Sequence, residues 1–313
     1  MKGLELAAAF YEAHGKPMLE EQFPALIPLI AVGLCGSGSE CLGYDDEVSR
    51  DHDFEPGFCL FLPGEDVVDR RAAFLLERAY AKLPREFEGV SRSLTQPVGG
   101  ARHGVLRTAE FFTEKVGSPD GILTVEQWLT LPGQALLEAT GGAIFADPYG
   151  EVTRIRQALS AYPEDIRRKK LAGHLLLMAQ AGQYNYRRCL SHGENAAAQL
   201  TAVEFVQSAM AAIFLLNGKY QPYYKWSFRA MRALPRLALE AEMLEFLLTT
   251  DNEGELADSK YDAIEGIAAD VIDELQTQGL TDAVCGDLEK HAYSVNDGIA
   301  DAGLRNRHIL AAV

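Results

Sequence analysis

The first half of the chain combines helical spacing of apolar residues with short, continuous apolar runs. Residues 4–14 have helical spacing, and Gly15-Lys16-Pro17 is predicted to end that helix. The apolar runs are bounded by glycine, proline or charged residues, which is typical of buried strands. This mixture favours a small sheet with helices packed on it. Strands are predicted at 29–35, 58–62, 105–107 and 143–146, and further helices at 65–83 and 124–137.

The pattern changes near residue 150. Beyond it glycines become sparse and three long helical patterns follow one another, at 171–186, 198–216 and 263–278. The expected fold class is therefore α/β (α+β), a mixed sheet with helices at the N-terminus, followed by an all-α helical bundle. We place the two domains at 1–150 and 151–313, although no Pro/Ser-rich linker marks the boundary.

Composition and charge restrict the binding partners. The chain has 313 residues, of which 48% are hydrophobic and 24% charged, as in an ordinary globular protein. Its formal net charge of -16 repels phosphate backbones, so general nucleic-acid binding is not expected. A nucleotide can still bind where a divalent cation lies between carboxylates and phosphates, because the ion reverses the local sign of the field.

Cysteine usage and hydropathy indicate the compartment. The five cysteines form no CxxC or zinc-type spacing, and such an odd, sparse set suits unbridged thiols in a reducing environment. The apolar stretch 24–36 is too short to cross a bilayer, and Pro28 interrupts it. Glu5 and Glu12 interrupt the apolar pattern of the N-terminus, unlike the core of a secretory leader. We expect a cytoplasmic protein with no membrane partner.

The segment from Gly36 to Phe54 carries the most chemical information. The turn Gly36-Ser37-Gly38-Ser39 follows a predicted buried strand. Glycine lets the backbone approach a phosphate closely, and serine hydroxyls and exposed N–H groups donate to its oxygens. Asp51 and Asp53 are one residue apart, so on a strand both carboxylates project from the same side. Such a pair needs cations to offset its repulsion, and Mg²⁺ binds carboxylates together with phosphate oxygens.

Each half of this pattern also has a simpler explanation. Asp-x-Asp occurs by chance in acidic proteins, often as a solvated turn, and residues 36–40 complete neither GxGxxG, nor a Walker loop, nor GxSxG. His103 and His174 stand apart from other ligand types, so zinc chemistry is not expected. The tract Asp45-Asp46-Glu47 is expected to be a solvated loop.

In this order and spacing, the two halves resemble the signature of the nucleotidyltransferase superfamily of the DNA polymerase beta type. Cys35-Gly36-Ser37 supplies the hydrophobic-Gly-Ser part, and Asp51-His52-Asp53-Phe54 the acidic part, with His52 replacing the usual hydrophobic residue. The phrases Ser49-Arg50-Asp51-His52-Asp53 and Pro222-Tyr223-Tyr224-Lys225-Trp226 extend the resemblance to aminoglycoside-type adenylyltransferases and to an uncharacterised bacterial branch catalogued as a domain of unknown function. The resemblance covers nearly the whole chain and is more specific in the N-terminal motif.

The resemblance implies a transferase that is dependent on Mg²⁺ or Mn²⁺. It would move a nucleoside monophosphate, AMP as the first choice, from an NTP such as ATP to an acceptor hydroxyl on an unknown small molecule or protein. Asp51 and Asp53 would hold the metal ions, and the turn with Ser37, or Ser39 in an alternative register, would bind the outer phosphates. A third carboxylate usually completes such a site. Glu110, after the predicted strand 105–107, is the first candidate, although a solvated helix residue explains it equally well.

Three residues of the helical half are weighed as further nucleotide-binding groups. Tyr184 would stack on a base and Arg188 would pair with a phosphate, while Lys225 lies in an aromatic tract that would bind nucleotide or acceptor. Packing and solubility are the more common roles of such residues, and an aromatic plug between helices is the simpler explanation of the tract around Lys225. Two other function classes stay open: a non-catalytic nucleotide-binding regulatory protein with the same fold, and a helical interaction protein in which neither aspartate is special.

Overall fold

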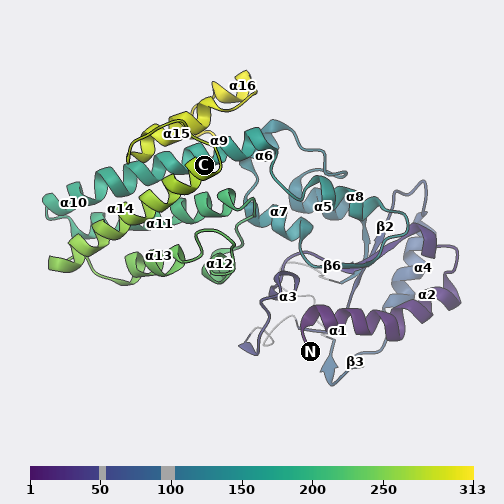
Figure 1. The fold of residues 1–313 in the computed structure, drawn as a ribbon. Coiled ribbons are helices and arrows are strands. Elements are labelled where there is room, and N and C mark those ends of the chain that lie inside the picture. Colours follow the sequence, from purple (N-terminus) through teal and green to yellow (C-terminus); the bar gives the residue numbers. More distant parts are fainter. Residues whose placement is uncertain (49–53, 93–102) are drawn as a thin grey trace. The chain divides into compact units, whose positions relative to one another are not determined.

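The computed structural model describes residues 1–48, 54–92 and 103–313. This part of the chain separates into two compact units (Figure 1). The sheet unit comprises Met1–Thr124 and Gln134–Ser160, and the helical unit comprises Val125–Gly133 and Ala161–Val313. The predicted fold class, a mixed sheet with helices followed by helices alone, is confirmed.

Four strands form the sheet, in the order β5-β2-β1-β6. The central strand β1 is antiparallel to both of its neighbours, whereas β2 and β5 are parallel. Both β1 and β2 are buried along their whole length, which explains their continuous apolar sequences. All four predicted strands are present. Their bounds are Ala31–Leu34 (β1), Cys59–Leu62 (β2), Gly104–Arg107 (β5) and Ala143–Ala146 (β6), and a separate hairpin pairs β3 (Glu86–Phe87) with β4 (Val90–Ser91).

The core of the sheet unit has a layer on either side of β2. Phe58, Leu60 and Leu62 belong to one buried cluster with Phe10 of the first helix and Leu76. Phe61 packs against Phe111, with ring centroids 5.2 Å apart. Successive residues of a strand face opposite sides, so this alternation places helices on both faces of the sheet. The helices that supply these layers are α1 (Gly3–Phe10), α2 (Lys16–Gln22), α3 (Ser39–Leu42), α4 (Arg70–Tyr80), α5 (Thr108–Val116) and α8 (Glu151–Ala158).

The prediction that the first helix ends at Gly15-Lys16-Pro17 is wrong. Helix α1 continues through a π-helical turn, Tyr11–Gly15, into α2. The wider turn removes the clash that a proline makes with the carbonyl four residues earlier. Gly15 is a packing residue here, because a Cβ at this position would overlap the ring of Phe58.

The predicted helix over 124–137 is in fact two helices separated at Pro132. They are α6 (Val125–Thr130) and α7 (Gly133–Thr140), and α6 belongs to the helical unit. Helix α8 stays with the sheet unit because the Arg156 guanidinium donates hydrogen bonds to the carbonyl oxygens of Thr140 and Gly141. The chain therefore passes from one unit to the other at 124–125, 133–134 and 160–161, and the boundary predicted from the sequence was near residue 150.

The helical unit is built around α9 (Glu164–Met178) and α11 (Asn195–Leu216). By length and composition α11 can cross a membrane, with a mean hydropathy of 1.5, but 61% of its apolar window is buried, as in a core helix. A π-helical segment, Ala179–Tyr186, continues α9 into α10 (Arg187–Ser191). The remaining helices are α12 (Tyr224–Met231), α13 (Glu240–Thr249), α14 (Gly254–Thr277), α15 (Leu288–Asp297) and α16 (Ala302–Arg305).

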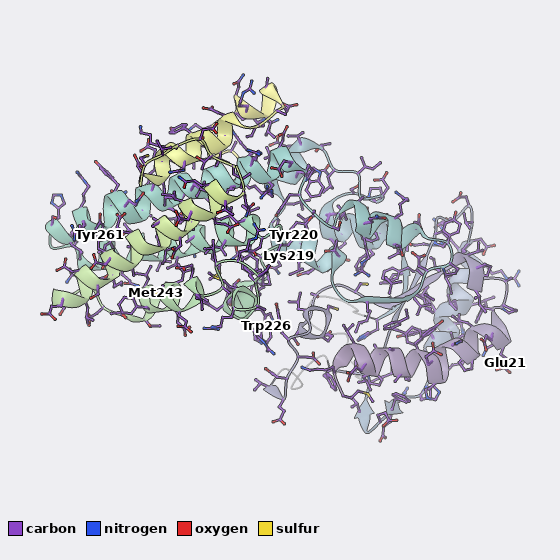
Figure 2. All side chains as sticks on the ribbon, viewed as in Figure 1. Glu21, Lys219, Tyr220, Trp226, Met243 and Tyr261 are labelled. Carbon is purple, nitrogen blue, oxygen red and sulfur yellow. The ribbon has the colours of Figure 1, made fainter. Side chains whose placement is uncertain are left out.

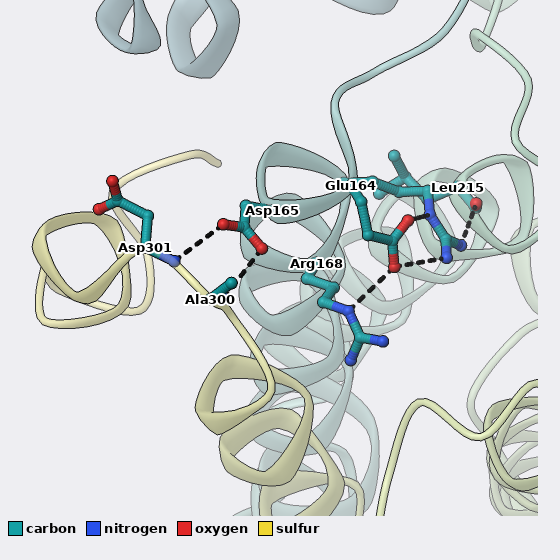
Figure 3. A network of polar contacts seen from close by, with 7 residues as sticks. Glu164, Asp165, Arg168, Leu215, Ala300 and Asp301 are labelled. Carbon is teal, nitrogen blue, oxygen red and sulfur yellow. Dashed lines mark hydrogen bonds and ion pairs between the residues drawn. The ribbon is translucent and has the colours of Figure 1, made fainter.

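The beginning of α9 is fixed by a polar network (Figure 3). The Asp165 carboxylate accepts hydrogen bonds from the backbone N–H groups of Ala300 and Asp301, at 3.0 and 2.9 Å. Glu164 accepts from the guanidinium groups of Arg167 and Arg168. Burial opposes ionisation of Glu164, but these two arginines outweigh it and hold its pKa below the usual value. The network therefore ties the C-terminal helices to α9.

Candidate functional site

The turn after β1 has the backbone that its glycines predict. Gly36 and Gly38 have φ angles of +115° and +132°, a region that favours glycine. Ser37 and Ser39 are half-buried, and Ser39 begins the short helix α3. A Cβ on Gly38 would overlap the carboxylate of Glu40, so a carboxylate lies directly beside the turn. A phosphate bound here therefore needs a cation, or a displaced Glu40 side chain, to offset the repulsion.

Strand register places the turn at the beginning of β2. Gly33 is opposite Cys59 in the antiparallel pair, so the end of β1 adjoins the start of β2. Asp51 and Asp53, the predicted metal ligands, precede β2 but lie outside the described residues.

The residue directly after Asp53 gives the nearest structural information on the acidic half of the motif. Atoms of Phe54 and of Glu40 lie within 4 Å of one point, the position that a Cβ on Gly3 would occupy. The ring of Phe54 therefore lies near the side chain of Glu40 in α3, the helix that follows the turn.

Glu110 lies beyond the end of β2, while the ring of the next residue, Phe111, lies 3.8 Å from the position of a Cβ on Gly36 in the turn. Glu110 is exposed in the first turn of α5, which follows the end of β5. Because β5 is parallel to β2, with Arg107 opposite Leu62, the residues after β5 lie beyond the far end of β2. The role of Glu110 as the third carboxylate therefore stays a prediction.

A histidine and a glutamate meet at the end of the sheet where the turn lies. His103, just before β5, has its Nδ1 3.3 Å from Glu55 Oε1, and their side chains are only 9% and 19% exposed. A Cβ on Gly57 would overlap the imidazole, so glycine is needed there. Sequence reasoning missed this pair because 48 residues separate its members. A carboxylate that orients an imidazole can make it an effective proton acceptor.

Arg156 places a positive charge beside the turn. Its Nη1 lies 3.5 Å from the Sγ of Cys35, the residue directly before the turn. Its Nη2 donates hydrogen bonds to backbone carbonyl oxygens. Burial raises the pKa of the Cys35 thiol to about 11, against the opposing effect of Arg156. The two residues are 121 positions apart, so no local pattern predicts the contact.

The expectation that Asp45-Asp46-Glu47 is a solvated loop is wrong for Asp45. This side chain is buried and accepts a hydrogen bond of 2.8 Å from the Gly3 backbone N–H. Lys2 pairs with it at 3.7 Å. Asp45 therefore anchors the beginning of α1, while Asp46 and Glu47 are exposed as expected.

The three candidates in the helical unit do not form one site. Tyr184 is 60% exposed, and the Arg188 guanidinium lies 4.9 Å from its ring centroid, so one face of the ring already carries an arginine. Lys225 lies 5.1 Å from the ring of Trp226. Arg188 lies on α10, which leads into the first residue of α11, whereas Lys225 follows its last residue. Lys225 itself lies on α12, after the segment that follows α11.

The surroundings of Tyr184 do not favour an anionic nucleotide. Tyr184 lines a hollow of about 560 Å³ with Asp287 and Glu289. The Gln183 side chain closes one wall by donating to the Gly286 carbonyl at 2.9 Å and accepting from the Leu288 N–H at 3.0 Å. Two carboxylates at the rim would repel phosphates.

The predicted metal ligands, Asp51 and Asp53, lie outside the described residues. Within 1–48, 54–92 and 103–313, no three histidine, cysteine, aspartate or glutamate side chains gather into a metal-binding group. A metal site formed with the predicted ligands therefore requires Asp51 and Asp53.

Comparison with known proteins gives one family and a distant structural similarity. Residues 128–227 match the model of a family described as a domain of unknown function (DUF4037), consistent with the predicted resemblance to such a branch. No curated protein matches the chain. The structure is similar, with a TM-score of 0.40 and 12% identity, to a nucleotidyltransferase-like protein from Exiguobacterium sibiricum, over 85% of this chain and 77% of that one.

Proposed function

We propose that the protein is a nucleotidyltransferase that moves a nucleoside monophosphate, AMP as the preferred one, from an NTP to an acceptor hydroxyl. The observation that carries the proposal is the proximity of the Phe54 ring to the Glu40 side chain, because Phe54 follows Asp53 directly and Glu40 belongs to the helix after the Gly/Ser turn. The register of β1 and β2 supports the same arrangement independently.

The proposed reaction can be assigned to residues of this chain. Asp51 and Asp53 would hold Mg²⁺ or Mn²⁺, which supplies charge neutralisation at the phosphates. Ser37 and the backbone of the turn would orient the outer phosphates. The acceptor oxygen forms a bond to the α-phosphorus, the bond from that phosphorus to the bridging oxygen breaks, and pyrophosphate leaves.

The proton of the acceptor hydroxyl needs a base. Glu110, the first candidate from the sequence, is exposed in the first turn of α5, after the end of β5. His103, oriented by Glu55, lies at the end that carries the turn and is the better candidate. Replacing His103 by Asn should lower the rate of transfer without abolishing NTP binding, whereas Glu110→Gln should change neither.

The test is an incubation of the full chain with labelled ATP, GTP, CTP and UTP plus Mg²⁺ or Mn²⁺. Pyrophosphate release and label transfer are followed with and without candidate acceptors. Asp51→Asn and Asp53→Asn should lower turnover by about two orders of magnitude or more. Glu47→Gln, an exposed acid in the same segment, is the matched control and should behave as the parent.

A regulatory protein that binds NTP without turnover is the second candidate, favoured by the place of Glu110 in an exposed helix turn beyond the end of β2. Metal-dependent NTP binding that is lost in Asp51→Asn, without pyrophosphate release by the parent, would support it. Binding that is unchanged in both aspartate variants, with intact melting curves, would refute both nucleotide functions.

A further inference from the structure

A pocket of about 400 Å³ lies wholly within the helical unit. It is bordered by the chain between α6 and α7, by α9, by the last turns of α11 and by residues 311–313. Leu129, Phe214 and Leu215 make most of its wall apolar, and Lys219, beside Tyr220 after the end of α11 (Figure 2), lies at its rim. This volume is in the range of small-molecule sites.

The pocket contains a buried ammonium group. Lys170 is 8% exposed, and its Nζ donates to the carbonyl oxygens of Leu129 at 2.7 Å and Ala312 at 3.4 Å. The same Nζ lies 5.6 Å from the ring centroid of Tyr162. These partners are neutral, and no carboxylate among the described residues forms an ion pair with it. Burial lowers the pKa of Lys170 to about 8, as expected for a cation without a counter-ion.

A second polar group of the pocket has no partner. His174 lies four residues after Lys170 on α9, on the same helix face. Its Nδ1 is buried and has no hydrogen-bond partner within the described part of the chain. Burial and the charge of Lys170 lower the pKa of His174 to about 4, so the imidazole is neutral near pH 7. A buried polar atom without a partner costs stability, which a bound ligand recovers.

We propose that this pocket binds a small organic monocarboxylate with an apolar body. One buried cation balances one negative charge, so a monoanion fits better than a phosphate ester. The Lys170 ammonium and a neutral His174 that carries its proton on Nδ1 supply two donors for the two carboxylate oxygens. The body of the ligand lies against Tyr162 and Phe214. The site shares no residue with the proposed nucleotide site.

The experiment uses the full-length protein at pH 7 with benzoate as the probe and benzamide as its uncharged twin. Trp128, whose ring centroid is 5.9 Å from that of Tyr162, reports binding through its fluorescence. Benzoate should give a saturable change and raise the melting temperature, whereas benzamide should do neither. Lys170→Met should weaken benzoate binding at least about tenfold. Lys290→Met, an exposed lysine of the helical unit that does not line the pocket, is the matched control and should change it by no more than about twofold.

Three results would overturn the proposal. Equal binding of benzamide would show that the pocket does not recognise charge. Unchanged benzoate binding to Lys170→Met would show that the ammonium group takes no part in binding. The lack of a saturable response to both benzoate and hexanoate would show that the pocket binds no carboxylate. Should Lys170→Met fail to fold, Ala211→Leu keeps the lysine and fills the pocket. Loss of benzoate binding in that folded variant supports the proposal, and retained binding refutes it.

Discussion

The Tyr80→Phe variant tests how the beginning of β2 is held. The Tyr80 hydroxyl donates to the Phe58 carbonyl oxygen at 2.8 Å and accepts from the Phe58 N–H at 3.1 Å. The hydroxyl is buried between α4 and the strand, and burial raises its pKa far above the usual value. Phe58 follows Asp53 by only a few residues, so Tyr80 fixes the strand that leads away from the proposed metal ligands.

The expected loss follows from what each Phe58 group keeps. Its carbonyl oxygen still accepts from the Gly104 N–H at 3.0 Å, so it remains bonded. Its N–H loses the Tyr80 oxygen, and a buried donor without a partner costs about 1–3 kcal/mol. The ring itself stays, so packing is unchanged. We expect the free energy of unfolding of the sheet unit to fall by about 2 kcal/mol.

Native-state hydrogen exchange measures this loss in the right unit. Trp128 and Trp226 both lie in the helical unit, so tryptophan fluorescence does not follow the sheet unit. The Phe58 amide should exchange roughly thirtyfold faster in Tyr80→Phe. Tyr11→Phe is the matched control, because Tyr11 also packs against the Phe58 ring. The raised pKa of Tyr11 comes from burial and neighbouring charges, whereas a hydrogen bond to Phe58 contributes to that of Tyr80. Unchanged Phe58 exchange, or equal losses in both variants, would refute the reasoning.

Two further predictions concern the helical unit. Gly182→Ala should lower stability by about 1–3 kcal/mol, because its Cβ would overlap Phe205. Gly266→Ala should raise stability by about 0.5–1 kcal/mol, because this position in α14 has open space around it. Equal shifts of the two variants in fluorescence-monitored melting would contradict this. Burial and the neighbouring Asp270 raise the pKa of Glu240 from 4.5 to about 7. The folded state then holds more protons than the unfolded state between these values, so stability falls as pH rises from 4.5 to 7. In Glu240→Gln, the decrease in the free energy of unfolding between pH 5 and pH 8 should be smaller by up to about 3 kcal/mol, measured from melting curves at the two pH values. The same pH dependence in variant and parent would contradict this.

The strands could be predicted from the sequence, whereas one helix end could not. β1 and β2 are buried on both faces, and such strands show directly as apolar runs. Gly15 and Pro17 have the composition of a helix stop, but the helix continues through them. Gly15 is present because the Phe58 ring packs against it and leaves no space for a Cβ. The partner of Gly15 lies far along the chain, and local propensity contains no information about it.

The candidate site shows the same division. The turn could be predicted because Gly36 and Gly38 adopt φ values that other residues avoid. The contacts of His103 with Glu55 and of Arg156 with Cys35 could not, since 48 and 121 residues separate the partners. The position of Glu110 depends on strand order and direction, because only the parallel pairing of β5 with β2 shows that it follows the end of β2 and not its start.

The two proposed sites solve the same electrostatic problem by different means. With a net charge of -16 the protein repels anions at long range, so each site needs a local positive charge. The sheet unit would use a divalent cation held by Asp51 and Asp53, whereas the helical unit uses the buried ammonium of Lys170. Chelation of divalent cations should therefore abolish NTP binding and leave benzoate binding unchanged, and Lys170→Met should do the reverse. Because the two perturbations act on separate residues, failure of one proposal leaves the other intact. Loss of both NTP and benzoate binding on chelation would show that the carboxylate site also depends on a metal.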